Sequence, residues 1–128
     1  MIVAGVGFRR SAAADEIVML VELALKRAAL THDALTKLGT IEALADMPAF
    51  TEAAHRLAVA AIAVGERDLF AAGPHVRTQS ARSLAAHGVG SVAEAAALAA
   101  AGPGATLVLE RIASTSVTCA LARPETAP

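Results

Sequence analysis

The chain opens with Ile2-Val3-Ala4-Gly5-Val6-Gly7-Phe8-Arg9-Arg10-Ser11, and the order of residue types in this stretch decides the fold that we expect. The apolar run is typical of a buried strand, and the two glycines indicate a turn at its end. Ser11 is a favourable N-cap for a helix that follows at once. A strand that leads through a glycine turn into a helix is a typical opening of an α/β domain.

The same turn is a candidate anion site. The backbone N–H groups at Gly5 and Gly7, the helix N-terminus and the side chains of Arg9 and Arg10 would lie together, which suits a negatively charged ligand. Arginines are otherwise unfavourable at the positive end of a helix dipole. Two plainer interpretations stay open, namely a purely structural glycine turn and arginines that point to solvent.

Nucleotides and nucleic acids do not fit this sequence. A dinucleotide fingerprint needs a third glycine where Arg10 stands, and a P-loop needs a Gly-Lys-Ser/Thr ending that is missing here. The 128 residues carry a net charge of −1 and no basic run longer than two residues. Because nucleic-acid binding needs clustered positive charge, we expect no nucleic-acid partner.

We also expect no membrane segment, no metal site and no cofactor. The longest weakly polar window, 92–101, is too short to span a bilayer, and the apolar start is too short for a signal peptide. The four histidines lack the spacing of metal ligands. The single cysteine, Cys119, is typical of a reducing compartment and is expected to be buried in a strand. These features predict a soluble cytoplasmic domain.

The rest of the chain alternates between helical and extended patterns. The expected helices cover 11–30, 48–57, 66–72, 79–86 and 91–102, and the expected strands after the first cover 38–44, 59–64, 106–110 and 116–121. The continuous apolar run 59–64 predicts a strand buried on both faces. The pattern predicts one three-layer α/β/α domain over residues 1–122 with a mixed, mostly parallel sheet, and a flexible tail over 123–128.

A second glycine loop, His87-Gly88-Val89-Gly90-Ser91, follows the helix over 79–86. Gly88 suits the left-handed position after a helix, and Ser91 with Glu94 forms the pattern of a capping box. His87 is the one histidine beside a possible ligand loop, although a helix C-terminus favours any histidine. No catalytic triad or carboxylate pair is recognisable, so any catalytic residue is unknown.

Three pieces in order resemble the CobE family, which is similar to the C-terminal domain of the cobalamin biosynthesis protein CbiG. They are Gly5-Val6-Gly7-Phe8-Arg9-Arg10, the segment from Gly88 to Leu98, and Ser116 to Ala122. The resemblance implies a role in making the corrin ring. In an open α/β sheet, the two glycine loops would meet at the carboxyl ends of the strands. The expected ligand-binding residues are Gly5, Gly7, Phe8, Arg9, Arg10, His87, Gly88, Gly90 and Ser91.

The sequence departs from that family pattern at several positions. Phe8 stands where the family usually has a cysteine, and Ser11 where it has a glycine. Leu44 and Met47 align with a lysine and a glutamate, and Glu110 aligns with a lysine. These changes remove groups that a reaction would use and favour binding over catalysis.

Three functions therefore stay open. The first is an accessory protein of aerobic cobalamin biosynthesis that binds a corrinoid or precorrin through its carboxylates. The second is an enzyme of the same pathway, such as a cobalt-precorrin-5A hydrolase that opens a lactone. The third is a module that docks on other cobalamin-pathway enzymes through its alanine-rich helices.

Overall fold

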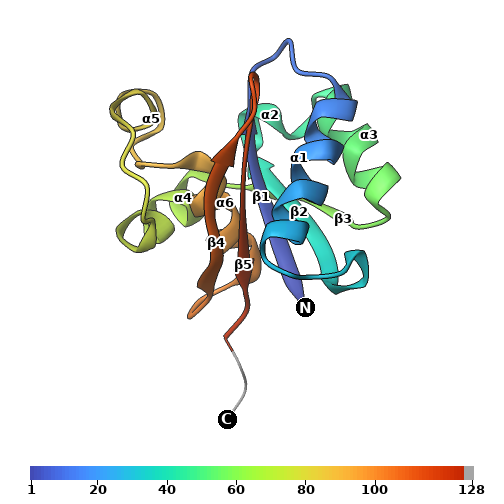
Figure 1. Cartoon of the computed structure of the whole chain (residues 1–128). Coiled ribbons are helices and arrows are strands. Elements are labelled where there is room, and N and C mark those ends of the chain that lie inside the picture. Colours follow the sequence, from blue (N-terminus) through green and yellow to red (C-terminus); the bar gives the residue numbers. More distant parts are fainter. Residues whose placement is uncertain (126–128) are drawn as a thin grey trace.

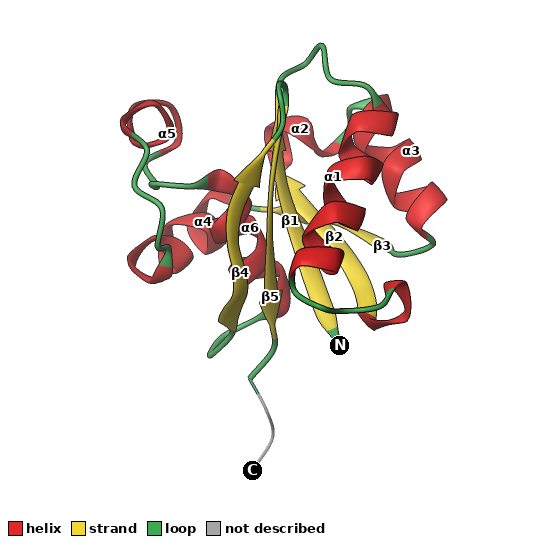
Figure 2. Cartoon of the chain, in the orientation of Figure 1, coloured by secondary structure: helices red, strands yellow, loops and turns green. Residues whose placement is uncertain are grey.

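The computed structural model describes residues 1–125 and places five strands in one sheet between two layers of helices (Figure 1, Figure 2). The strands are β1 (Ile2–Phe8), β2 (Leu35–Ile41), β3 (Ala60–Val64), β4 (Thr106–Ala113) and β5 (Val117–Arg123). The helices are α1 (Ala14–Arg27), α2 (Glu42–Ala45), α3 (Pro48–Leu57), α4 (Glu66–Ala72), α5 (Ala81–His87) and α6 (Val92–Ala101). Two 3₁₀ turns, η1 (His32–Ala34) and η2 (Gly73–His75), complete the elements.

The sheet has the order β3-β2-β1-β5-β4. β1 and β3 are each parallel to β2, whereas β5 is antiparallel to both β1 and β4. Consequently only β5 opposes the common strand direction. This confirms the expected α/β fold with a mixed sheet in which most strands point the same way.

The two faces of the sheet are covered differently. α1 and α3 pack against each other and form one layer, while α6 crosses β1, β5 and β2 on the other face with α4 outside it (Figure 2). One apolar cluster fills the α1–α3 side, and a second surrounds α6. The carboxyl ends of β1, β2, β3 and β4 therefore meet at one edge, where the loops gather.

The expected glycine turn at the start is wrong, because Gly5 and Gly7 lie inside β1. Gly5 is buried under α6, and a Cβ atom placed on it would stand 2.2 Å from the carbonyl oxygen of Ala93. The glycine is needed because strand and helix backbones touch here, which no side chain permits.

The start of the first helix also differs from the expectation. α1 begins at Ala14 with Ala13 as its N-cap and no side-chain cap, so Ser11 does not cap it. The N–H of Ala12 donates to the carbonyl oxygen of Arg9 at 2.9 Å and closes a turn between β1 and α1. The arginines therefore lie on a loop and not at the helix N-terminus.

The middle of the sheet carries two further corrections. β2 covers Leu35–Ile41 instead of 38–44, since residues 42–45 form the short helix α2. β3 is largely exposed, although its apolar sequence predicted burial on both faces. The physical reason is its place at the edge of the sheet, where small alanine side chains are only partly covered.

Other local predictions are confirmed. α3 begins at Pro48, α4 covers the expected residues, and Gly88 has the left-handed φ of 74°. β4 and β5 are both longer than expected, and β5 includes Arg123. Residues 126–128 of the expected tail lie outside the described residues.

Within residues 1–125, no single helix is long and apolar enough to cross a membrane. α5 and α6 meet the length and composition requirement only as a pair, and they are bent by 60° at the break between them.

Candidate functional site

A groove of about 460 Å³ lies where β1 ends, at the edge to which the strands point. Its floor comes from the end of β1 and the turn between β4 and β5. One wall comes from α5 and the first residues of α6, and Arg111 on β4 forms part of another wall. The N–H of Arg9 donates to the carbonyl oxygen of Ser116 at 2.9 Å, which holds the floor together.

Three arginines from three different elements line this groove. Arg9 follows β1, Arg82 is on α5 and Arg111 is on β4, and His87 lies among them. None of the lining residues is acidic. Guanidinium groups bind carboxylates bidentately, so this arrangement favours an anion that carries more than one carboxylate.

Hydroxyl groups supply the remaining polar lining. Ser80, Ser83, Ser91, Ser114, Thr115, Ser116 and Thr118 all border the groove. The Ser91 hydroxyl already accepts a hydrogen bond from the Glu94 N–H at 3.2 Å and caps α6. The Ser114 hydroxyl and the Ser116 N–H both donate to the carboxylate of Glu16, which fixes the β4–β5 turn and lowers the pKa of Glu16. The turn is therefore held in place before any ligand binds.

The structure brings together part of the predicted site. Gly7, Phe8, Arg9, His87 and Ser91 all line the groove. Gly5 does not, because it is buried beneath α6.

Three other predicted residues lie outside the groove lining. Arg10 is exposed, and its Nη1 atom lies 3.5 Å from the Met47 sulfur. Gly88 borders a neighbouring pocket beside Phe70. Gly90 is buried at a point where a Cβ atom would meet the Thr78 carbonyl oxygen at 2.5 Å. Gly90 therefore permits a close crossing of two chain segments at this point.

Sequence reasoning missed Arg82 and Arg111. Arg82 lies within a predicted helix, and Arg111 was expected just beyond a predicted strand, so neither has a local motif around it. A search for basic residues near the expected carboxyl ends of strands would have found Arg111. Only the three-dimensional path of the chain brings Arg82 to the same place.

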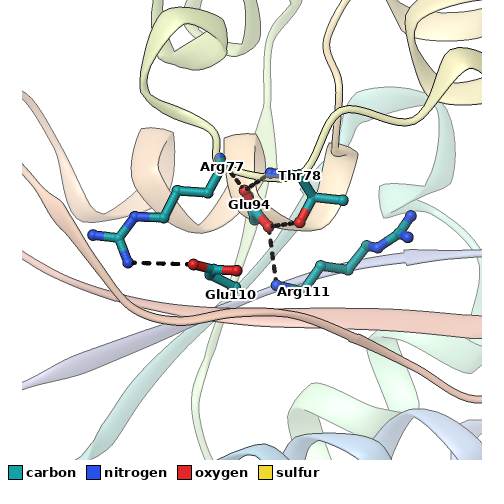
Figure 3. A network of polar contacts seen from close by, with 5 residues as sticks. All are labelled: Arg77, Thr78, Glu94, Glu110 and Arg111. Atoms are coloured by element: carbon teal, nitrogen blue, oxygen red, sulfur yellow. Dashed lines mark hydrogen bonds and ion pairs between the residues drawn. The ribbon is translucent and has the colours of Figure 1, made fainter.

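Glu94 has a role that differs from the predicted capping box. Its side chain is fully buried and accepts from the N–H groups of Arg77 at 2.6 Å, Thr78 at 3.0 Å and Arg111 at 3.0 Å, and from the Thr78 hydroxyl (Figure 3). The Ser91 hydroxyl makes its half of the capping box, but the Glu94 carboxylate turns away from the Ser91 N–H toward these donors. Burial alone would raise the pKa of Glu94, but the four hydrogen bonds outweigh it and lower the pKa below its ordinary value.

Two further side chains, those of Phe8 and Cys119, pack against or within the hydrophobic core. The Phe8 ring stacks on Phe50 with ring centres 6.3 Å apart. Cys119 is fully buried, and this burial raises the pKa of its thiol to about 12. The thiol is therefore not a nucleophile. Among the described residues, no group of three or more His, Cys, Asp or Glu side chains could hold a metal ion.

Residues 2–122 match the family model described as the cobalamin synthesis G C-terminus. The chain belongs to this family. It is 35% identical over 125 residues to protein CobE of Sinorhizobium sp, an alignment that covers 98% of this chain and 81% of that protein. Like its relatives, this member of the cobalamin synthesis G C-terminus family takes part in cobalamin biosynthesis.

Solved structures agree with this assignment. The crystal structure of CobE, a protein from the cobalamin biosynthetic pathway, superposes with a TM-score of 0.91 at 31% identity and covers 100% of this chain and 93% of that one. Cobalamin biosynthesis protein chiG from Agrobacterium tumefaciens gives a TM-score of 0.74 at 35% identity, with 98% and 100% covered. A cobalamin biosynthesis protein G homolog from Sulfolobus solfataricus shares the fold (TM-score 0.73, 24% identity), but the match covers 97% of this chain and 37% of that longer chain.

The family assignment confirms the resemblance drawn from the three segments. The structure gives the residues of the first segment, 5–10, two different roles. In this family member, Gly5 serves the packing of α6 on β1, whereas Gly7, Phe8 and Arg9 line the groove.

Proposed function

We propose that the domain binds a corrinoid precursor, with the ligand's peripheral carboxylates held in the arginine groove. The observation that carries this proposal is the meeting of Arg9, Arg82 and Arg111 at a groove with no acidic lining residue. Corrinoid precursors carry several acetate and propionate carboxylates around an apolar ring. A polycarboxylate of this kind complements three guanidinium groups, and membership of a cobalamin-biosynthesis family makes such a ligand available.

The size and openness of the groove favour binding of one edge of the ring. Sites that enclose a small ligand have volumes of about 300–1,000 Å³, and this groove of about 460 Å³ is at the lower end. Arg9 and Arg82 are both exposed, so most of a bound macrocycle would stay accessible. An accessible ligand fits a protein that passes its corrinoid to another enzyme of the pathway.

The contacts around the groove favour binding over catalysis. A hydrolase needs an activated nucleophile, which commonly takes the form of a hydroxyl or thiol beside a base. Within residues 1–125, no hydrogen bond joins His87 to a hydroxyl, and the Cys119 thiol is buried away from the groove. The lactone-opening hydrolase is therefore less well supported than corrinoid binding.

Titration of the purified protein with hydrogenobyrinic acid tests the proposal. We expect the absorbance bands of the corrinoid to shift and to saturate at one ligand per chain, while the mass of the recovered ligand stays the same. Unchanged bands across the titration would reject the binding function. Release of acetaldehyde from a lactone-containing precorrin would instead establish the hydrolase.

A further inference from the structure

The wall of the groove that carries Arg82 has little packing of its own. α5 contains no buried residue and stands away from the sheet in Figure 1. Residues 79–90 form a loop that is closed at its base, where the Ser80 N–H donates to the Gly90 carbonyl oxygen at 2.9 Å. The Ser83 hydroxyl donates to the Val89 carbonyl oxygen at 2.6 Å within the same loop. The position of Arg82 therefore depends on how the base of this loop is held.

The wall that carries Arg111 contains an irregularity in β4. Leu109 pairs with Leu121 and Ile112 pairs with Cys119, so β4 has one residue more than β5 across this interval. Such a bulge leaves a backbone N–H without its ladder partner and redirects a side chain. Here the freed N–H of Arg111 donates to Oε2 of Glu94 at 3.0 Å.

Glu94 holds both walls with one carboxylate. Oε1 accepts from the N–H groups of Arg77 and Thr78, directly before the base of the α5 loop, and Oε2 accepts from the Thr78 hydroxyl and from Arg111. Figure 3 shows that the side chains of Arg77 and Arg111 extend away from this carboxylate. Arg77 Nη1 lies 3.7 Å from Glu110 Oε1 instead. The charge of Glu94 is thus met by backbone amides and a hydroxyl, and the Arg111 guanidinium stays available to the groove.

We propose that Glu94 is a positioning residue of the arginine groove. It fixes the base of the loop that carries Arg82 and the bulge that carries Arg111. This inference rests on the proposed corrinoid binding. Glu94 does not line the groove. Its effect on affinity passes only through the two arginines whose segments it joins.

The substitution Glu94→Gln tests this role, because the amide keeps the shape but replaces one acceptor oxygen by a donor. We expect faster hydrogen exchange at the amides of Arg77, Thr78 and Arg111, while the amides of β1 keep their protection. We also expect affinity for hydrogenobyrinic acid to fall about tenfold, the factor that corresponds to one lost charged hydrogen bond.

Two other variants separate positioning from general stability. Thr40→Val removes a buried hydrogen bond, from the Thr40 hydroxyl to the Val6 carbonyl oxygen at 2.7 Å, that lies between strands outside the groove lining. It should lower stability without weakening ligand binding. Thr78→Val removes only the hydroxyl bond to Glu94, and it provides the same test if Glu94→Gln does not fold.

The decisive comparison uses the double variant Arg82→Ala with Arg111→Ala. If Glu94 acts through these arginines, adding Glu94→Gln to the double variant changes affinity no further. An equal loss in both backgrounds, or unchanged exchange at the three amides, would overturn the inference. If the unaltered protein binds no corrinoid, the proposed function fails, whereas the exchange measurement still decides whether Glu94 fixes the two walls.

Discussion

A Cβ atom placed on Gly5 would lie 2.3 Å from the backbone nitrogen of Ala97, so β1 and α6 touch backbone to backbone at this point. The neighbouring strand has the same adaptation, because Gly39 is the register partner of Gly5 and also lies beneath α6. A Cβ atom on Gly39 would meet the methyl carbon of Ala100 at 3.1 Å, which is a milder conflict.

Gly5→Ala is therefore expected to destabilise the fold strongly. The added methyl group has only backbone in front of it, so α6 must move away from the sheet. We expect the free energy of unfolding to fall by about 3 kcal/mol, at the upper end of the usual range for overpacking. Urea unfolding measures this loss.

Gly39→Ala is the matched control, because it adds the same methyl group one strand away. Its expected cost is about 1 kcal/mol, since a side-chain methyl group can yield by a small shift. Equal losses for the two variants would show that the close contact at Gly5 is not what sets the distance of α6 from the sheet.

The sequence predicted those helix ends that a single residue determines. Pro48 begins α3, Gly88 adopts the left-handed conformation after α5, and the Ser91 hydroxyl caps α6. Each of these residue types has a backbone preference or a short-range hydrogen bond that acts without tertiary contacts. The family resemblance came from three segments, namely residues 5–10, 88–98 and 116–122.

Features set by tertiary packing could not be predicted in this way. The apolar sequence of β3 does not reveal that the strand lies at an edge of the sheet. The glycines of β1 looked like a turn because sequence alone does not show that a helix lies against the strand. Glu94 fitted a capping box by spacing, and only the fold shows the donors from residues 77, 78 and 111 that draw its carboxylate away.

The lowered pKa of Glu94 predicts that the folded state loses stability as the pH falls. The folded protein holds the ionised form more strongly than the unfolded chain, where the ordinary pKa is 4.5. The stabilisation is therefore complete above that pH and is lost as the pH falls toward the lower folded-state pKa. The charged side chains beside it, Arg77, Glu110 and Arg111, are exposed or half-buried and lie on segments that it holds.

Urea unfolding between pH 7 and pH 3 measures this effect. Glu94→Gln should be about 1–3 kcal/mol less stable at pH 7, because buried donors lose an acceptor. The difference in free energy of unfolding between the two proteins should shrink as the pH falls. The natural protein loses the stabilisation from its ionised carboxylate, and the variant has no carboxylate to lose. A constant difference across this pH range would contradict the hydrogen-bonded carboxylate.

Cys119 provides a test of the core. Because burial raises the pKa of its thiol to about 12, the folded protein should not react with iodoacetamide at pH 8. The same reagent should label the single cysteine fully in urea. Rapid labelling without denaturant would mean that β5 opens far more readily than its buried position in the sheet implies.

The arginines of the groove should each contribute to ligand affinity. Arg9→Ala, Arg82→Ala and Arg111→Ala are each expected to weaken corrinoid binding by about 1–3 kcal/mol, with little effect on folding. Arg27→Ala is the matched control, because Arg27 is exposed in the last turn of α1 and does not line the groove. Affinity is measured by absorbance titration. A variant that binds as tightly as Arg27→Ala would remove that arginine from the site.

The most direct test of the central claim compares two ligands that differ only in their carboxylates. Calorimetric titration of the unaltered protein uses hydrogenobyrinic acid and the same corrinoid with its side-chain carboxylates converted to amides. Carboxylate recognition by Arg9, Arg82 and Arg111 predicts saturable binding of the acid and loss of binding for the amidated ligand. Equal affinity for both ligands, or no heat of binding with the acid, would contradict it.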